Sequence, residues 1–334
     1  MFRILTFWPL LLFLSHGCTH VQTCPDEVAA AFDIGSGSTK VQVVERNSCS
    51  LKISQTLLKT SIAVGYAQDL SSGKKAFSQK IVLQGEQALK NLMKKSLVYH
   101  PEKVFGVATQ AFRQAKNGAK VLENWHHRYG WPFKIIDQRK EAMLAYELVV
   151  LKLDVPDEKK LMVWDIGGGS QQVVTMNKNK TLNIFKSKLA AVTFKNKVIE
   201  LLQRPSGTLS PNPMKLPEIG QSLELARNII RSELNPDVLN NIKSSEIVIG
   251  LGGVHGASIK NQLGLQDGER ITLEGIERAI MERIGLSDDQ IGGDYASTDL
   301  TNLILIKGLM LEYDLKSYTP ISTSLTESLL RQIP

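Results

Sequence analysis

Two short motifs carry the residue types that bind phosphate in proteins. Residues 33–38 read DIGSGS, and residues 165–170 repeat this string as DIGGGS, with one difference in six positions. Glycines let backbone N–H groups approach an anion, serine hydroxyls add donors, and an aspartate at a strand end suits a hydrated divalent cation. One copy alone is also typical of an ordinary tight turn, but recurrence in the same order favours a duplicated phosphate site. We assign phosphate binding to Gly35, Ser36, Gly37, Ser38, Gly167, Gly168, Gly169 and Ser170, and metal binding to Asp33 and Asp165.

The elements around both motifs are predicted to be strand, glycine turn and strand. Each motif follows a short apolar run and precedes a β-branched stretch. A third strand follows each pair, and helical and strand patterns then alternate, so we predict an α/β protein with mixed sheets. Residues 65–75 are polar and contain glycine, which predicts a loop. The expected strands are 28–32, 40–46, 51–60, 104–108, 133–136, 161–164, 173–175, 182–185 and 247–249.

Length and composition are those of a two-domain globular protein. The chain has 334 residues, of which 43% are hydrophobic and 22% charged. Its net charge of +7 favours anionic partners. No dense basic run with interleaved aromatics is present, so a specific nucleic-acid partner is not expected.

The first 17 residues have the pattern of an export signal. Arg3 precedes an apolar core that is too short to span a bilayer, and small residues follow it. Residues 14–18 (LSHGC) resemble a bacterial lipoprotein cleavage box, which predicts lipidation of Cys18; simple cleavage is the alternative. Export would place Cys24 and Cys49 in an oxidising compartment, where they could pair or remain reduced.

With these motifs in place, the chain resembles the exopolyphosphatase and guanosine pentaphosphate phosphohydrolase (Ppx/GppA) family, within the actin, Hsp70 and sugar kinase superfamily. The resemblance covers roughly residues 28–330. Besides the two glycine motifs, it is carried by residues 108–113 (ATQAFR), Glu141-Ala142 ahead of a hydrophobic helix, 250–253 (GLGG) and 324–327 (SLTE).

The resemblance implies two ribonuclease-H-like lobes with a cleft between them. Lobe I would comprise residues 26–145 and lobe II residues 146–295, with residues 296–334 returning to lobe I. Glu141 would activate the attacking water, Arg113 would lie near the substrate phosphates, and Gly252 and Gly253 would form a third phosphate loop. Mg²⁺ or another divalent cation would be the cofactor. From the residues alone, Glu141 also fits a helix-start carboxylate and Arg113 a surface helix arginine.

Two single positions and one short segment depart from the family pattern. Residues 136–139 (IDQR) replace the usual Ser-Gly ahead of the catalytic region. Lys40 replaces an apolar or aromatic residue and has the spacing of the phosphate-contacting lysine of actin, although an exposed strand cation fits equally well. Gln172 replaces a glutamate that assists the metal; its amide could still ligate, but the lost charge should lower divalent affinity.

Our leading hypothesis is therefore a phosphoric anhydride hydrolase that releases terminal orthophosphate from polyphosphate or a polyphosphorylated nucleotide such as guanosine pentaphosphate. The alternative, motivated by Gln172 and the predicted export, is an exported sensor with weak or no catalysis. An actin-like ATPase is a third hypothesis. The expected location is the cell envelope or periplasm, with a lipid on Cys18 as the membrane link, and a homodimer is compatible with the sequence.

Overall fold

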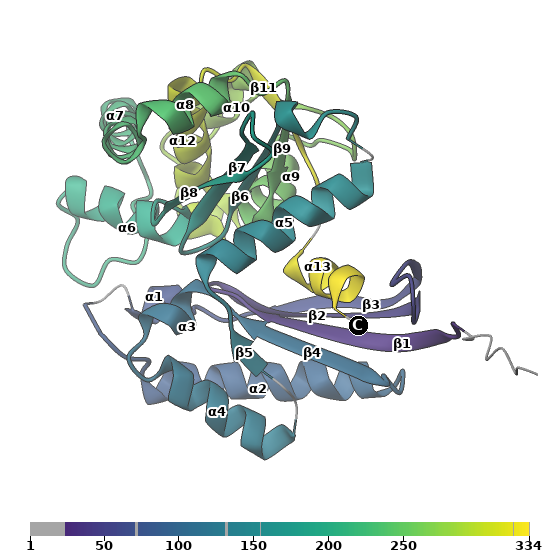
Figure 1. Ribbon diagram of the computed structural model, residues 1–334. Helices are drawn as coiled ribbons and strands as arrows, with labels where there is room; N and C mark the ends of the chain where they lie inside the picture. The colour runs from purple at the N-terminus through teal and green to yellow at the C-terminus, as the bar shows by residue number, and fades with distance from the viewer. Residues whose placement is uncertain (1–23, 71–72, 131–132, 154, 323, 334) are drawn as a thin grey trace, which may run out of the picture.

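The computed structural model in Figure 1 describes residues 24–70, 73–130, 133–153, 155–322 and 324–333. The predicted signal peptide, residues 1–17, and Cys18 lie outside these residues. Within the described ranges, every helix is too short or too polar to cross a membrane.

The first sheet has five strands in the order β3-β2-β1-β4-β5. As predicted, the first three strands form an antiparallel meander around the first glycine motif. The next two run parallel to the first. The strands are β1 (Asp26–Ile34), β2 (Ser38–Asn47), β3 (Ile53–Ala63), β4 (Lys103–Ala108) and β5 (Phe133–Ile135).

The second sheet repeats this arrangement. Its order is β10-β11-β9-β6-β7-β8, in which β8-β7-β6-β9-β11 corresponds to the whole first sheet, with the same parallel and antiparallel pairs. The predicted pair of ribonuclease-H-like lobes is therefore confirmed. The strands are β6 (Leu161–Ile166), β7 (Gln171–Met176), β8 (Leu182–Ser187), β9 (Ile247–Leu251), β10 (Ile271–Thr272) and β11 (Ser317–Pro320).

Helices cover the outer face of each sheet (Figure 1). The expected loop at residues 65–75 contains a short helix, because Tyr66, Ala67 and Leu70 are buried in the first core. In lobe I the helices are α1 (Tyr66–Leu70), α2 (Gln79–Leu97), α3 (Gln110–Gln114) and α4 (Gly118–Tyr129). In lobe II they are η1 (Glu158–Lys160), α6 (Ala191–Leu201), α7 (Leu216–Glu233), α8 (Pro236–Lys243), η2 (Val254–Ile259), α9 (Lys260–Gln262), α10 (Leu273–Met281), α11 (Asp288–Ile291) and α12 (Ala296–Tyr313).

Helix α5 (Gln138–Leu153) lies between the two sheets (Figure 1). Leu144 belongs to an apolar cluster on the first sheet, whereas Ala145 and Val149 pack against the second. The helix is apolar on two sides because it is covered on two sides. Its first turn, which carries Glu141, is thereby fixed at the junction of the lobes.

The C-terminal segment divides between the lobes, which corrects the expectation for residues 296–334. Helix α12 is buried against α6, α7 and α10, and β11 pairs with β9, so both belong to lobe II. Only α13 (Leu325–Gln332) returns to β1 and β2 of lobe I. There the fully buried Arg46 of β2 donates hydrogen bonds to the carbonyls of Leu330 and Ile333. The expected boundary at residue 145 falls inside α5.

Cys24 and Cys49 form a disulfide, with a Cα–Cα distance of 5.5 Å. The bond joins the chain just before β1 to the turn between β2 and β3. Of the two states that the sequence left open, the structure therefore contains the paired one.

Candidate phosphate-binding site

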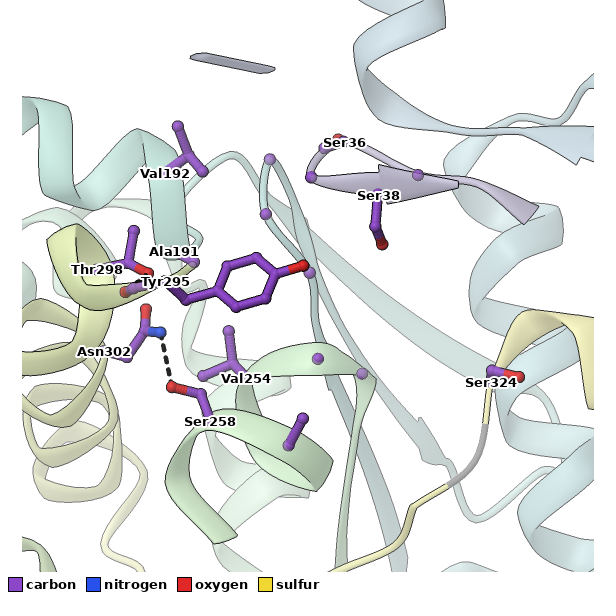
Figure 2. A pocket seen from close by; sticks show the side chains of 18 of the residues that line it. Ser36, Ser38, Ala191, Val192, Val254, Ser258, Tyr295, Thr298, Asn302 and Ser324 are labelled. Atoms are coloured by element: carbon purple, nitrogen blue, oxygen red, sulfur yellow. Dashed lines mark hydrogen bonds between the residues drawn. The ribbon is translucent and has the colours of Figure 1, made fainter. Parts of the chain in front are cut away.

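A cavity of about 670 Å³ lies between the lobes and is lined by both glycine motifs. Figure 2 shows the first motif, with Ser36 and Ser38, opposite the start of α6 and the residues of lobe II. Of the residues assigned from sequence, all but Arg113, Gln172 and the lipidation candidate Cys18 line this cavity. They are Asp33, Gly35, Ser36, Gly37, Ser38, Lys40, Glu141, Asp165, Gly167, Gly168, Gly169, Ser170, Gly252 and Gly253.

The two glycine turns have the same local structure and meet across the cleft. The amide of Gly35 donates to the carbonyl of Ser38 at 2.9 Å, and the amide of Gly167 donates to that of Ser170 at 3.0 Å. A Cβ on Gly169 would lie 2.2 Å from Gln110 Oε1 and 2.9 Å from Ser36 Oγ. A Cβ at this position would therefore displace the Gln110 and Ser36 side chains of lobe I, which approach the second turn closely.

Glu141 enters the cavity from the first turn of α5. Its side chain is 14% exposed, and Arg113 Nη1 lies 2.9 Å from its Oε2. The same Nη1 donates to the carbonyl of Ile136 at 2.7 Å. Burial raises the pKa of Glu141 to about 7, although Arg113 opposes the shift. At neutral pH this carboxyl group can therefore both accept and release a proton.

Arg113 itself was expected at the substrate phosphates, and its position differs. It is absent from the cavity lining and holds the Glu141 carboxylate instead. The physical reason is that a buried carboxylate needs a cation or hydrogen-bond donors, and Arg113 is the guanidinium within reach. Its contact with the site is therefore through Glu141.

Lys40 and Gln172 occupy equivalent positions, each two residues after the last serine of its motif. Asp33 pairs directly with Lys40 across β1 and β2, and Asp165 pairs with Gln172 across β6 and β7. Lys40 Nζ lies 3.3 Å from Asp33 Oδ2, and the charge of Asp33 raises the pKa of the lysine. Gln172 is 1% exposed and donates to Ser170 Oγ at 3.2 Å. Burial raises the pKa of Asp165 to about 6, against the influence of Lys40.

These side chains do not fit a divalent cation held by the protein alone. Among the described residues there is no group of three or more carboxylate, histidine or cysteine ligands. Asp33 Oδ2 accepts a hydrogen bond from Lys40 Nζ. The Gln172 amide donates to Ser170 Oγ, and Gln172 is not part of the cavity lining. Asp33 Oδ1 is buried and has no hydrogen-bond partner among the residues that the structure describes. One orphaned oxygen and the Asp165 carboxylate are too few for an all-protein Ca²⁺ site, and a Mg²⁺ ion here would need waters and substrate phosphates as its remaining ligands.

Beyond the glycine turns, the cavity continues into a polar compartment of lobe II that the sequence did not reveal. We call it the polar compartment and define it by Ser258, Gln262, Tyr295 and Asn302. Asn302 Nδ2 donates to Ser258 Oγ at 2.9 Å, and Tyr295 extends from the start of α12 toward the turns (Figure 2). Asn302 Oδ1 and Gln262 Oε1 are both buried and, in the described part of the chain, have no partner. The Gly292-Gly293 pair before Tyr295 was the one sequence signal of a special loop here.

Gly252 has no space for a side chain, whereas the adjacent Gly253 does. Gly252 has φ +83°, and a Cβ would lie 2.4 Å from both Asp165 Oδ1 and the carbonyl oxygen of Ile166. A Cβ on Gly253 would meet no atom of the described part of the chain within 4 Å. The third glycine loop thus packs directly on the end of β6.

We expect Gly252→Ala to lower the free energy of unfolding by roughly 2 kcal/mol or more, through left-handed backbone strain and the clash at Asp165. Gly253→Ala is the matched control and should change it by less than about 0.5 kcal/mol. Urea unfolding followed by circular dichroism measures both. Equal stability of the two variants would contradict the close packing at Gly252.

Comparisons with known proteins agree with this fold. Residues 43–287 match the model of the Ppx/GppA phosphatase family. A Ppx/GppA enzyme of Aquifex aeolicus has 19% identity and a TM-score of 0.69, covering 92% of this chain and 99% of its own. An exopolyphosphatase from Cytophaga hutchinsonii has 17% identity and a TM-score of 0.73, covering 91% and 96%. Because the family model spans most of the chain, this protein belongs to the Ppx/GppA phosphatase family and is an exopolyphosphatase-like hydrolase.

Proposed function

We propose that this phosphohydrolase removes the terminal orthophosphate from a polyphosphorylated compound held between the two glycine motifs. The observation that carries the proposal is the common cavity of both motifs and Glu141, whose pKa lies near 7. Backbone amides and serine hydroxyls suit phosphate oxygens, and a carboxylate near neutrality suits a general base.

In the proposed reaction, a water oxygen attacks the terminal phosphorus and its proton passes to Glu141. The bond from that phosphorus to the bridging oxygen breaks, and the electron pair stays on the shortened chain. Such reactions depend mainly on positioning and on stabilising charge. Arg113 acts as a positioning residue, because its contact with Glu141 Oε2 fixes the carboxylate relative to the turns.

Glu141→Gln should lower phosphate release by at least about a hundredfold, because the amide cannot accept the water proton. The matched control is Glu147→Gln, on the same helix but outside the cavity lining. Release of orthophosphate from long-chain polyphosphate and from guanosine pentaphosphate, with and without Mg²⁺, is the measurement. Equal activity of Glu141→Gln and the wild type would remove Glu141 from the mechanism. Binding of both substrates without turnover by the wild type would favour the sensor hypothesis.

The pH dependence of kcat/KM should follow the ionisation of Glu141. Because the base must be ionised, kcat/KM should rise with pH through about 7 and level off above it. Arg113 lowers the pKa of Glu141, so Arg113→Gln should move the acidic limb upward by roughly one pH unit. Arg128→Gln, at a surface ion pair with Glu86, is the control and should leave the limb in place. An unmoved limb in Arg113→Gln would contradict this role.

The polar compartment favours a polyphosphorylated nucleotide over plain polyphosphate as substrate. The orphaned Asn302 Oδ1 and Gln262 Oε1 are acceptors that need N–H or O–H donors. A nucleobase and a ribose supply such donors, whereas ionised polyphosphate has none. Tyr295 adds a flat aromatic surface at the mouth of the compartment.

Asn302→Leu should therefore weaken binding of guanosine pentaphosphate by roughly tenfold, because a buried acceptor is lost. Binding of tripolyphosphate, which does not need the compartment, should be unchanged and serves as the internal control. Calorimetric titration of both ligands measures the difference. Equal weakening of guanosine pentaphosphate and tripolyphosphate binding would show that the compartment does not recognise the substrate.

Export of the protein is also proposed, with Cys18 as the lipid site. The support is the Cys24–Cys49 disulfide, since such bonds persist mainly in oxidising compartments.

A further inference from the structure

The two glycine motifs differ in charge at one equivalent position. Strand register places Lys40 opposite Asp33 and Gln172 opposite Asp165. In the second copy the side chain is neutral and bonds to Ser170 within its own motif. In the first copy it is a cation in contact with the aspartate. The duplicated site thus carries one built-in positive charge.

Lys40 also interacts with both aspartates of the cavity. The basic residues in the described lining are Lys40 and Arg283, and Arg283 Nε lies 2.6 Å from Asp299 Oδ1. The Lys40 ammonium interacts with Asp165 as well as with Asp33. A divalent cation bound beside Asp33 would have to displace this ammonium or accept its repulsion.

We propose that Lys40 is a fixed counter-cation of the phosphate site, taking the place of a divalent ion beside Asp33, so that the free protein holds no metal there. The ammonium neutralises Asp33, whose Oδ2 it contacts, and it remains directed at the cavity in which the phosphates would lie. It therefore lowers the cost of bringing an anion next to the Asp33 and Asp165 carboxylates. The proposal depends on the proposed function in one respect, which is that the bound anion is a phosphate.

Mn²⁺ binding to the free protein tests the proposal without any turnover. Paramagnetic resonance of Mn²⁺ counts bound and free ion in the absence of phosphate. We expect weak binding to the wild type and binding tighter by roughly tenfold or more in Lys40→Gln, which gives the first motif the side chain of the second. Lys40→Arg keeps the charge and should behave like the wild type. Lys59→Gln, an exposed lysine on β3, is the surface control.

The double variant Lys40→Gln/Asp33→Asn locates the gained ion. It should lose the gain, because Asp33 supplies the charge that holds the metal. Tight Mn²⁺ binding by the wild type, no gain in Lys40→Gln, or a gain that persists in the double variant would each overturn the proposal. Thermal unfolding of every variant confirms that the comparison is made on folded protein. A failure of the proposed hydrolysis would appear instead as absent phosphate release and would leave these binding results unchanged.

Discussion

Three carboxylates lie in one partly enclosed cavity, and the protein must compensate their negative charges there. Asp33, Asp165 and Glu141 all line it, and their mutual repulsion adds to the cost of burial. Each is accommodated differently. Lys40 compensates Asp33, Arg113 compensates Glu141, and Asp165 is left with a pKa raised to about 6 by burial. A site of this kind can change its charge near neutral pH.

The geometry of the cavity depends on α5 and on the approach of the two glycine motifs. Helix α5 packs on both sheets, so the Glu141 carboxylate is positioned relative to both lobes at once. The second motif lies against Ser36 and Gln110 of lobe I, with no space for a Cβ on Gly169. A change in lobe orientation would therefore alter the phosphate turns and the carboxylate together.

The duplication is structural rather than chemical. Both sheets share one strand order, and both glycine turns are closed by the same backbone hydrogen bond. The side chains have diverged where the copies face each other. Lys40 of one copy lines the cavity, whereas Gln172 of the other bonds to Ser170 and is not part of the lining. Each motif therefore contributes a similar backbone cradle but a different charge.

The sequence by itself determined the strand-turn-strand units and the repeated phosphate motifs, because these depend on local periodicity and on residue types at short spacing. The two-lobed class was implied by the resemblance to a known family. Contacts between distant segments were decided by the tertiary structure. Arg113 turned out to hold Glu141, although the sequence placed it near phosphate. Packing assigned α12 to lobe II. Arg113 and Glu141 are 28 positions apart in the chain, and only the folded chain brings them within bonding distance.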